Sequence, residues 1–226
     1  SDEKGRNAQE VWKYVETGPD YRSFSLVNWR EDGGAIYLSR PKYGTAWAYF
    51  DYNPGMMILD LGTGQMTSIG DVNGVHDGLV SPDGRWLAQS KISEQSGDSA
   101  KVSILIRSLA DDMAREVACA EGATVAGDFS FSPGNEWLTW REWATAPGGS
   151  IFLIRVLRLP DGEPLTVYGD AETTAPSIGG WLGENDLVLV YPRLEDGSGG
   201  YSTFVTLPAV GSGEFLSPFS FVGLLD

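Results

Sequence analysis

The sequence predicts an all-β fold, a β-propeller of four-stranded antiparallel blades, and three observations carry that prediction. A short phrase recurs with anchors at Trp29, Val80, Phe131 and Trp181, which lie 51, 51 and 50 residues apart. Around each anchor, strand-like segments alternate with turns rich in Gly, Pro, Asn and Asp, and helix signals are nearly absent. Four strands in a repeat of this length are typical of a propeller. The repeats of a β-helix are shorter, and a β-sandwich does not repeat its turns so regularly.

The third repeat shows the pattern most clearly. Residues 127–132 alternate apolar and polar side chains and end at the turn Pro133-Gly134-Asn135-Glu136. A second strand is expected at 137–143, and the near-continuous apolar run 151–157 indicates a third strand covered on both faces. A more polar fourth strand is expected at 165–168.

The other repeats follow the same order. Strands are expected at 24–29, 35–40, 57–61 and 66–69 in the first repeat, at 79–81, 86–93, 102–109 and 116–120 in the second, and at 177–182, 187–191, 202–207 and 214–216 in the fourth. The long segment 41–55 is expected to carry one more strand at 46–52. Residues 108–115 fit either one helical turn capped by Ser108 or a loop.

These strands define one propeller over residues 11–226, preceded by a tail at 1–10. Its repeat units are 24–69, 78–120, 127–168 and 177–218. Strand remnants are expected at both termini, at 11–15 and 219–223, in addition to about four full blades. Three explanations stay open: a fragment of a larger propeller, a fifth blade shared by the termini, or a compact four-bladed ring.

The best-preserved copy of the phrase, Ser81-Pro82-Asp83-Gly84-Arg85-Trp86-Leu87-Ala88, resembles the TolB-type and Trp-Asp-like propeller repeats. The same repeat is similar to that of the propeller domains of prolyl-oligopeptidase-like peptidases. The copy at 132–138 departs from it, with Gly134-Asn135 in place of Asp-Gly. The resemblance to TolB-like proteins implies an extracytoplasmic location, in the bacterial periplasm or at the cell surface, with the cytoplasm as the alternative.

Charge and composition exclude some partners. The net charge is −15, and the 16 Lys and Arg residues are scattered, so the basic stripe that nucleic acid requires is missing. No apolar run approaches the length of a membrane span, and we expect no membrane insertion. The single cysteine, Cys119, is expected to be a buried small hydrophobe.

The sequence predicts no catalytic site, so we expect the chain not to be an enzyme. There is one histidine, His76, and no Gly-x-Ser-x-Gly string. The segment 70–78 has carboxylate, amide and imidazole groups but lacks the closing Glu of a calcium loop, so we expect a turn, with no metal and no cofactor. The inner strands offer a single acid, Asp128, instead of the pair that glycoside hydrolysis needs.

The aromatic residues divide between packing and binding. Trp29, Trp86 and Trp137 are expected to pack the blades. The connections from second to third strand, and from fourth strand to the next first strand, share one face of a propeller, which we call the loop face. Its most distinctive side chains, and the predicted binding residues, are Tyr43, Trp47, His76, Asp77 and Trp143.

The function expected from these features is a non-catalytic module for protein–protein interaction or scaffolding, with a protein partner. Two alternatives stay open. One is the substrate-gating propeller of a serine peptidase, and the other is a lectin-like propeller that binds carbohydrate.

Overall fold

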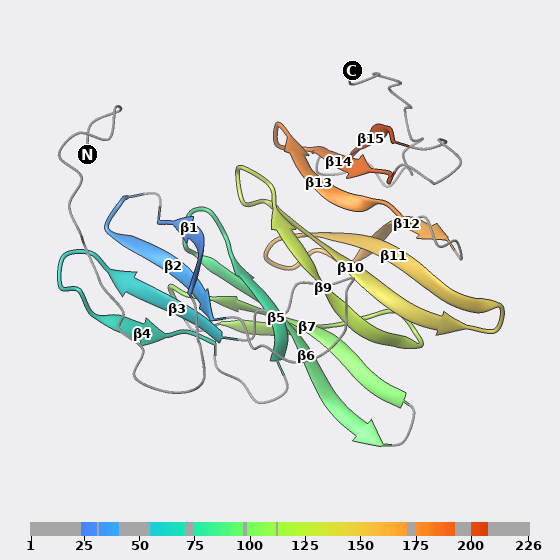
Figure 1. The fold of residues 1–226 in the computed structure, drawn as a ribbon, viewed down its shortest axis with the longest axis horizontal. Coiled ribbons are helices and arrows are strands. Elements are labelled where there is room, and N and C mark those ends of the chain that lie inside the picture. Colours follow the sequence, from blue (N-terminus) through green and yellow to red (C-terminus); the bar gives the residue numbers. More distant parts are fainter. Residues whose placement is uncertain are drawn as a thin grey trace.

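A computed structural model describes residues 24–30, 32–40, 55–70, 75–96, 99–111, 113–170, 175–192 and 200–207. Within these ranges the structure is all-β. Four antiparallel sheets follow one another along the chain as the blades of a four-bladed β-propeller arrangement (Figure 1). The predicted fold class is therefore confirmed.

The strands follow the predicted order in every blade. Blade 1 contains β1 (Ser25–Trp29), β2 (Ala35–Arg40), β3 (Gly55–Asp60) and β4 (Met66–Ser68), and blade 2 contains β5 (Val75–Val80), β6 (Trp86–Ser96), β7 (Ser99–Ser108) and β8 (Ala114–Ala118). Blade 3 contains β9 (Ala123–Phe131), β10 (Trp137–Ala146), β11 (Gly149–Arg158) and β12 (Leu165–Asp170), and the described part of blade 4 contains β13 (Ser177–Leu182), β14 (Asp186–Val190) and β15 (Ser202–Thr206). The strands predicted at 11–15, 46–52, 214–216 and 219–223 lie outside the described residues. Between β7 and β8 the chain makes a turn at 109–111, so the loop expected there is observed instead of the helical turn.

The recurring phrase forms a hydrogen-bonded turn between the first and second strands. The Ser81 hydroxyl accepts a hydrogen bond from the Trp86 amide at 2.9 Å and donates one to Asp83 at 2.6 Å. Gly84 adopts φ +74°, which explains why glycine is placed there. In the third repeat Ser132 accepts from the Trp137 amide at 3.1 Å, and Asn135 takes the left-handed position with φ +61°.

Apolar clusters join each pair of consecutive blades. Tyr37, Met56, Val80 and Leu87 pack between blades 1 and 2. The cluster between blades 2 and 3 includes Val102, Ile104, Leu138, Trp140 and Leu157. The cluster between blades 3 and 4 includes Trp137, Ile154, Val156, Leu187 and Leu189. Each pair of consecutive blades therefore buries apolar side chains at its junction.

Two of the three tryptophans expected to pack blades do so. Trp137 is buried between blades 3 and 4, and Trp86 packs against the cluster between blades 2 and 3. The prediction is wrong for Trp29, whose exposed fraction is 50%. Trp29 is the last residue of β1, in the place that Val80 and Phe131 take in the next two repeats, so it does not share the position of Trp86 and Trp137.

The first strand of every blade contains an irregularity in its pairing with the second strand. The register shifts between Leu26 and Asn28, Val75 and Gly78, Gly127 and Ser130, and Ile178 and Gly180. A β-bulge re-aims side chains and is over-represented next to functional sites. Because the first strands contact one another in chain order, the bulges bring side chains of consecutive blades together.

Candidate functional site on the loop face

The structure describes two of the five predicted binding residues fully. Tyr43 and Trp47 lie outside the described residues, and for His76 only the backbone, in β5, is described. Asp77 lies in the bulge near the start of β5, and Trp143 lies near the end of β10. In these antiparallel blades, first strands start and second strands end at the loop face, so both residues lie toward it.

Asp77 is a buried link between blades 2 and 3, with an exposed fraction of 5%. Its carboxylate accepts hydrogen bonds from the amides of Gly78 at 2.8 Å and Asp128 at 2.9 Å. Its own amide donates to the hydroxyl of Ser90 at 2.9 Å. A buried carboxylate held by amide donors positions the backbone around it.

Asp128 continues this link into blade 3. Its φ of +54° is unusual for a residue with a side chain and lies in the bulge of β9. The Asp128 carboxylate accepts a hydrogen bond from Arg141 at 2.8 Å. The expectation of one inner-strand acid is wrong, because β5 begins before Leu79 and places Asp77 on an inner strand beside Asp128.

Arg141, Trp143 and Phe152 form an aromatic and cationic group on blade 3. The Trp143 and Phe152 rings stack with centroids 5.6 Å apart, and the Arg141 guanidinium lies 5.3 Å from the Phe152 centroid. On the neighbouring strands β10 and β11, Trp143 lies opposite Phe152 and Arg141 lies opposite Ile154. Ile154 packs in the cluster between blades 3 and 4. Because alternate residues of a strand share a face, the whole group lies on the side of blade 3 that faces blade 4.

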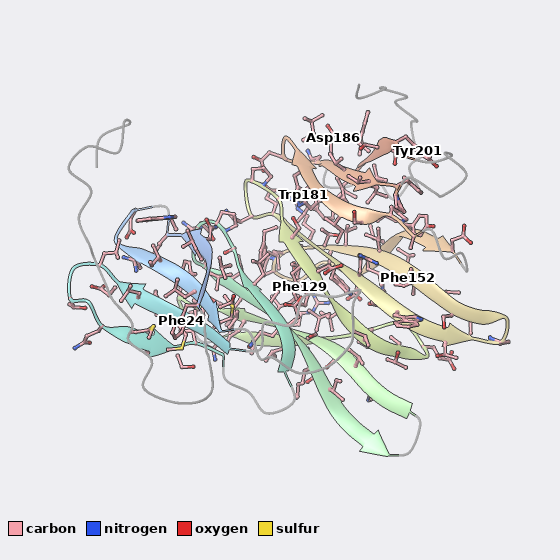
Figure 2. All side chains as sticks on the ribbon, in the orientation of Figure 1. Phe24, Phe129, Phe152, Trp181, Asp186 and Tyr201 are labelled. Atoms are coloured by element: carbon pink, nitrogen blue, oxygen red, sulfur yellow. The ribbon has the colours of Figure 1, made fainter. Side chains whose placement is uncertain are left out.

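Three tyrosines extend this face toward blade 4. Tyr191 and Tyr201 stack with centroids 4.6 Å apart and planes at 15°, and Tyr168 meets Tyr191 edge-on at 6.2 Å. Tyr168 pairs with Ile154 on β12, so it shares the blade 3 face with Phe152. Figure 2 shows Phe152 on blade 3 and Tyr201 on blade 4. We call these five residues, Trp143, Phe152, Tyr168, Tyr191 and Tyr201, the aromatic row.

The tyrosine end of the row has an acidic neighbour. Burial raises the pKa of Tyr191, and the nearby Tyr201 and Asp170 raise it further, so its hydroxyl keeps its proton at neutral pH. Asp170 is exposed and pairs with Phe152 across β11 and β12. The row thus combines ring faces, phenol groups and one carboxylate.

Sequence reasoning identified Trp143 but missed the other four members of the row. Tyr191 and Tyr201 flank the connection between β14 and β15. Two tyrosines on either side of one hairpin connection are expected to lie close together, and this signal was present in the sequence. The amide of Tyr191 donates to the carbonyl of Tyr201 at 2.9 Å, which holds the two rings at the base of that connection. The partnership with Tyr168 has no sequence signal, because it joins two blades.

The opposite face of blade 3 carries a buried ionic group. Glu142, which is fully buried, accepts hydrogen bonds from the Trp140 indole at 2.7 Å and the Ala120 amide at 2.8 Å. Its carboxylate lies 3.4 Å from Arg155. Burial, reinforced by Glu142, raises the pKa of the Cys119 thiol, so the thiol stays protonated and poorly nucleophilic. This group joins blades 2 and 3 inside the fold.

Among the described residues, no three His, Cys, Asp or Glu side chains gather as ligands for a metal ion. The same part of the chain has no helix long and apolar enough to cross a membrane.

No family model and no curated protein matches the chain. Solved structures resemble its fold. The β-propeller domain of the trilobed protease from Pyrococcus furiosus has a TM-score of 0.54 and 11% identity, over 88% of this chain and 57% of that one. Pyrococcus horikoshii acylaminoacyl peptidase has a TM-score of 0.54 and 13% identity, and the match covers 88% of this chain and 32% of the peptidase. Oligogalacturonate lyase from Vibrio parahaemolyticus has a TM-score of 0.51 and 12% identity, and the match covers 80% of this chain and 57% of the lyase.

These comparisons show the fold alone, since identities are low, and they confirm the resemblance to the propeller domains of peptidases. The aligned region spans little more than half of the trilobed protease propeller and about a third of the acylaminoacyl peptidase.

Proposed function

We propose that the chain is a non-catalytic binding module that recognises a protein partner through its loop face. The observation that carries the proposal is the aromatic row: a stacked pair on blade 3 and a group of three tyrosines that joins blades 3 and 4 and includes Tyr201, which is exposed by 41%. Aromatic side chains on a rigid framework bury much area at low entropic cost, which is why they are enriched at protein interfaces. The envelope location remains a proposal that rests on the sequence resemblance.

The partner test uses one exposed residue of the row and a matched control. Tyr201→Ser truncates the exposed end of the row, and Leu182→Ser truncates a residue exposed by 61% at the opposite end of the same blade. A protein captured by the wild-type chain and then purified should bind the Leu182→Ser chain like wild type. It should bind Tyr201→Ser about tenfold more weakly, as for loss of an interface anchor. Equal binding to all three chains would reject the loop face as the interface.

A second candidate, the substrate-gating propeller of a serine peptidase, is favoured by the structural likeness to the trilobed protease and acylaminoacyl peptidase. The chain itself has one histidine, so a Ser-His-Asp set within it would have to use His76. We expect no turnover of fluorogenic peptides by the purified chain and no labelling by a serine-directed fluorophosphonate. Turnover that disappears in His76→Ala would overturn the non-catalytic assignment.

A further inference from the structure

We infer that two copies of this chain join end to end, with blade 4 of each copy packed on blade 1 of the other, as one ring of eight blades. The inference goes beyond the proposed function, because it concerns the two ends of the blade array and not the loop face. It follows from the place of Trp29 in the repeat, from the outer faces of blades 1 and 4, and from the way in which consecutive blades pack.

Trp29 occupies, in blade 1, the position of a residue that packs against the preceding blade. The anchors of the next three repeats are Val80, Phe131 and Trp181. Val80 lies in the cluster between blades 1 and 2, Phe131 lies in the cluster between blades 2 and 3, and Trp181 packs against the cluster between blades 3 and 4. No blade precedes blade 1 in the described part of the chain, and Trp29 is exposed by 50%. Its position therefore fits a junction with another blade.

The face of blade 1 that carries Trp29 is apolar. On the neighbouring strands β1 and β2, Trp29 lies opposite Ile36 and Leu26 lies opposite Leu38. Ile36 and Leu38 alternate with Tyr37, which packs toward blade 2, so they point to the other face of the sheet. Leu26 has an exposed fraction of 57%. Blade 1 therefore turns two large exposed side chains away from blade 2.

Blade 4 has an apolar face at the other end of the array. Leu187 and Leu189 pack toward blade 3, so Val188 and Val190 point to the opposite face. Phe204 of β15 lies opposite Val188 on this outer face. In blades 2 and 3 the third strands, β7 and β11, carry apolar side chains of the cluster with the next blade. Phe204, on the third strand of blade 4, takes the corresponding place.

The described blades form an open array. Strand β1 contacts β5, β5 contacts β9, and β9 contacts β13, and none of the three apolar clusters joins blade 4 to blade 1. Blades 1 and 4 lie at the two ends of this array (Figure 1). The large apolar side chains exposed on the two end faces are Leu26 and Trp29 of blade 1 and Leu182 and Val190 of blade 4. Exposed apolar patches on a repeat array mark surfaces that another unit covers.

A second copy of the chain covers both ends at once. With a two-fold axis along the axis of the ring, the two junctions are equivalent, and this head-to-tail contact closes. Eight blades lie within the usual range of propellers. The four blades of this chain match 57% of the chain of the trilobed protease propeller, so their arrangement is compatible with part of a larger ring.

The test measures the mass of the full chain by sedimentation equilibrium in about 0.15 M salt, which screens the repulsion between copies of net charge −15. We expect monomers in equilibrium with dimers of twice the 24.4 kDa chain mass, and no larger species. A chain that stays monomeric at about 0.1 mM would overturn the inference, also if its end faces bind a different protein. Open-ended polymers would overturn it as well, because the ring would not close.

Charged substitutions locate the junction. Leu26→Glu and Val190→Glu each place a carboxylate in both junctions of a dimer and should weaken association at least about tenfold. Met113→Glu and Leu165→Glu are matched controls, since these side chains are exposed by 57% and 40% and belong to blades 2 and 3. Both controls should associate like wild type. Circular dichroism checks that each variant is folded, and equal losses in folded variants and controls would overturn the inference.

Mixing the two variants tests the head-to-tail order. In a mixed dimer, blade 4 of the Leu26→Glu copy meets blade 1 of the Val190→Glu copy, and this junction carries no substitution. An equimolar mixture should therefore form dimers at concentrations at which each variant alone is monomeric. A dimer that is lost in one variant only, or a mixture of folded variants that shows no such rescue, would overturn the inference.

Discussion

At the residue scale, the recurring phrase is explained by a serine that closes a turn. Ser81 and Ser132 are both fully buried, and each accepts a hydrogen bond from the amide of the tryptophan that begins the next strand. An amide that loses its acceptor away from water costs free energy, so the serine hydroxyl stabilises the turn by accepting from the tryptophan amide. The phrase therefore has a structural role in closing the turn between the first and second strands.

Ser132→Ala should lower the free energy of unfolding by about 1–2 kcal/mol, because the Trp137 amide loses its acceptor. The control is Ser177→Ala, an exposed serine at the start of β13, with an expected change within about 0.5 kcal/mol. Urea unfolding followed by tryptophan fluorescence measures both. An equal effect of the two substitutions would contradict the role given to the turn.

At the scale of elements, β10 makes two different junctions. Its even-numbered residues Trp140 and Glu142 face blade 2, where Glu142 bonds to Ala120, the residue that leads from β8 toward β9. Its odd-numbered residues Arg141 and Trp143 belong to the loop-face site. Successive side chains of a strand point to opposite faces, so one face of β10 contributes to a structural junction and the other to the candidate binding surface.

Glu142→Gln should destabilise the chain by about 3 kcal/mol, because Arg155 loses its carboxylate in a buried setting. Glu136→Gln is the matched control, since Glu136 pairs with Arg158 at 3.0 Å on the surface and should cost about 1 kcal/mol or less. Chemical denaturation of the two variants gives the comparison. Similar losses would mean that the buried group contributes no more than a surface pair.

At the scale of the whole molecule, stability is distributed over junctions between neighbouring blades. The clusters that join blades 1 and 2, 2 and 3, and 3 and 4 are made of different residues. In a repeat array, each unit is stabilised mainly by its neighbours. Local openings should therefore be confined to the blades that share a damaged cluster.

Leu189→Ala, in the cluster between blades 3 and 4, should cost about 2–5 kcal/mol and speed amide exchange mainly in β10, β11, β14 and β15, the strands that carry the cluster. Leu87→Ala, in the cluster between blades 1 and 2, is the reciprocal control and should speed exchange in β2 and β6. Hydrogen exchange read by mass spectrometry resolves the blades. A uniform loss of protection in both variants would show that the molecule opens as a single unit.

The sequence by itself determined the all-β class, the repeat and nearly all described strands, because turn residues and side-chain alternation are local signals. Only the tertiary structure decided which side chains meet. Asp77 reaches Asp128 because two bulged strands lie side by side, and Tyr168 meets Tyr191 because blades 3 and 4 pack together. These contacts depend on register and on packing between blades, so a pattern read along one strand does not contain them. Trp143 was found from the sequence as an unusual residue, and its place in a row of five aromatic residues came from the fold.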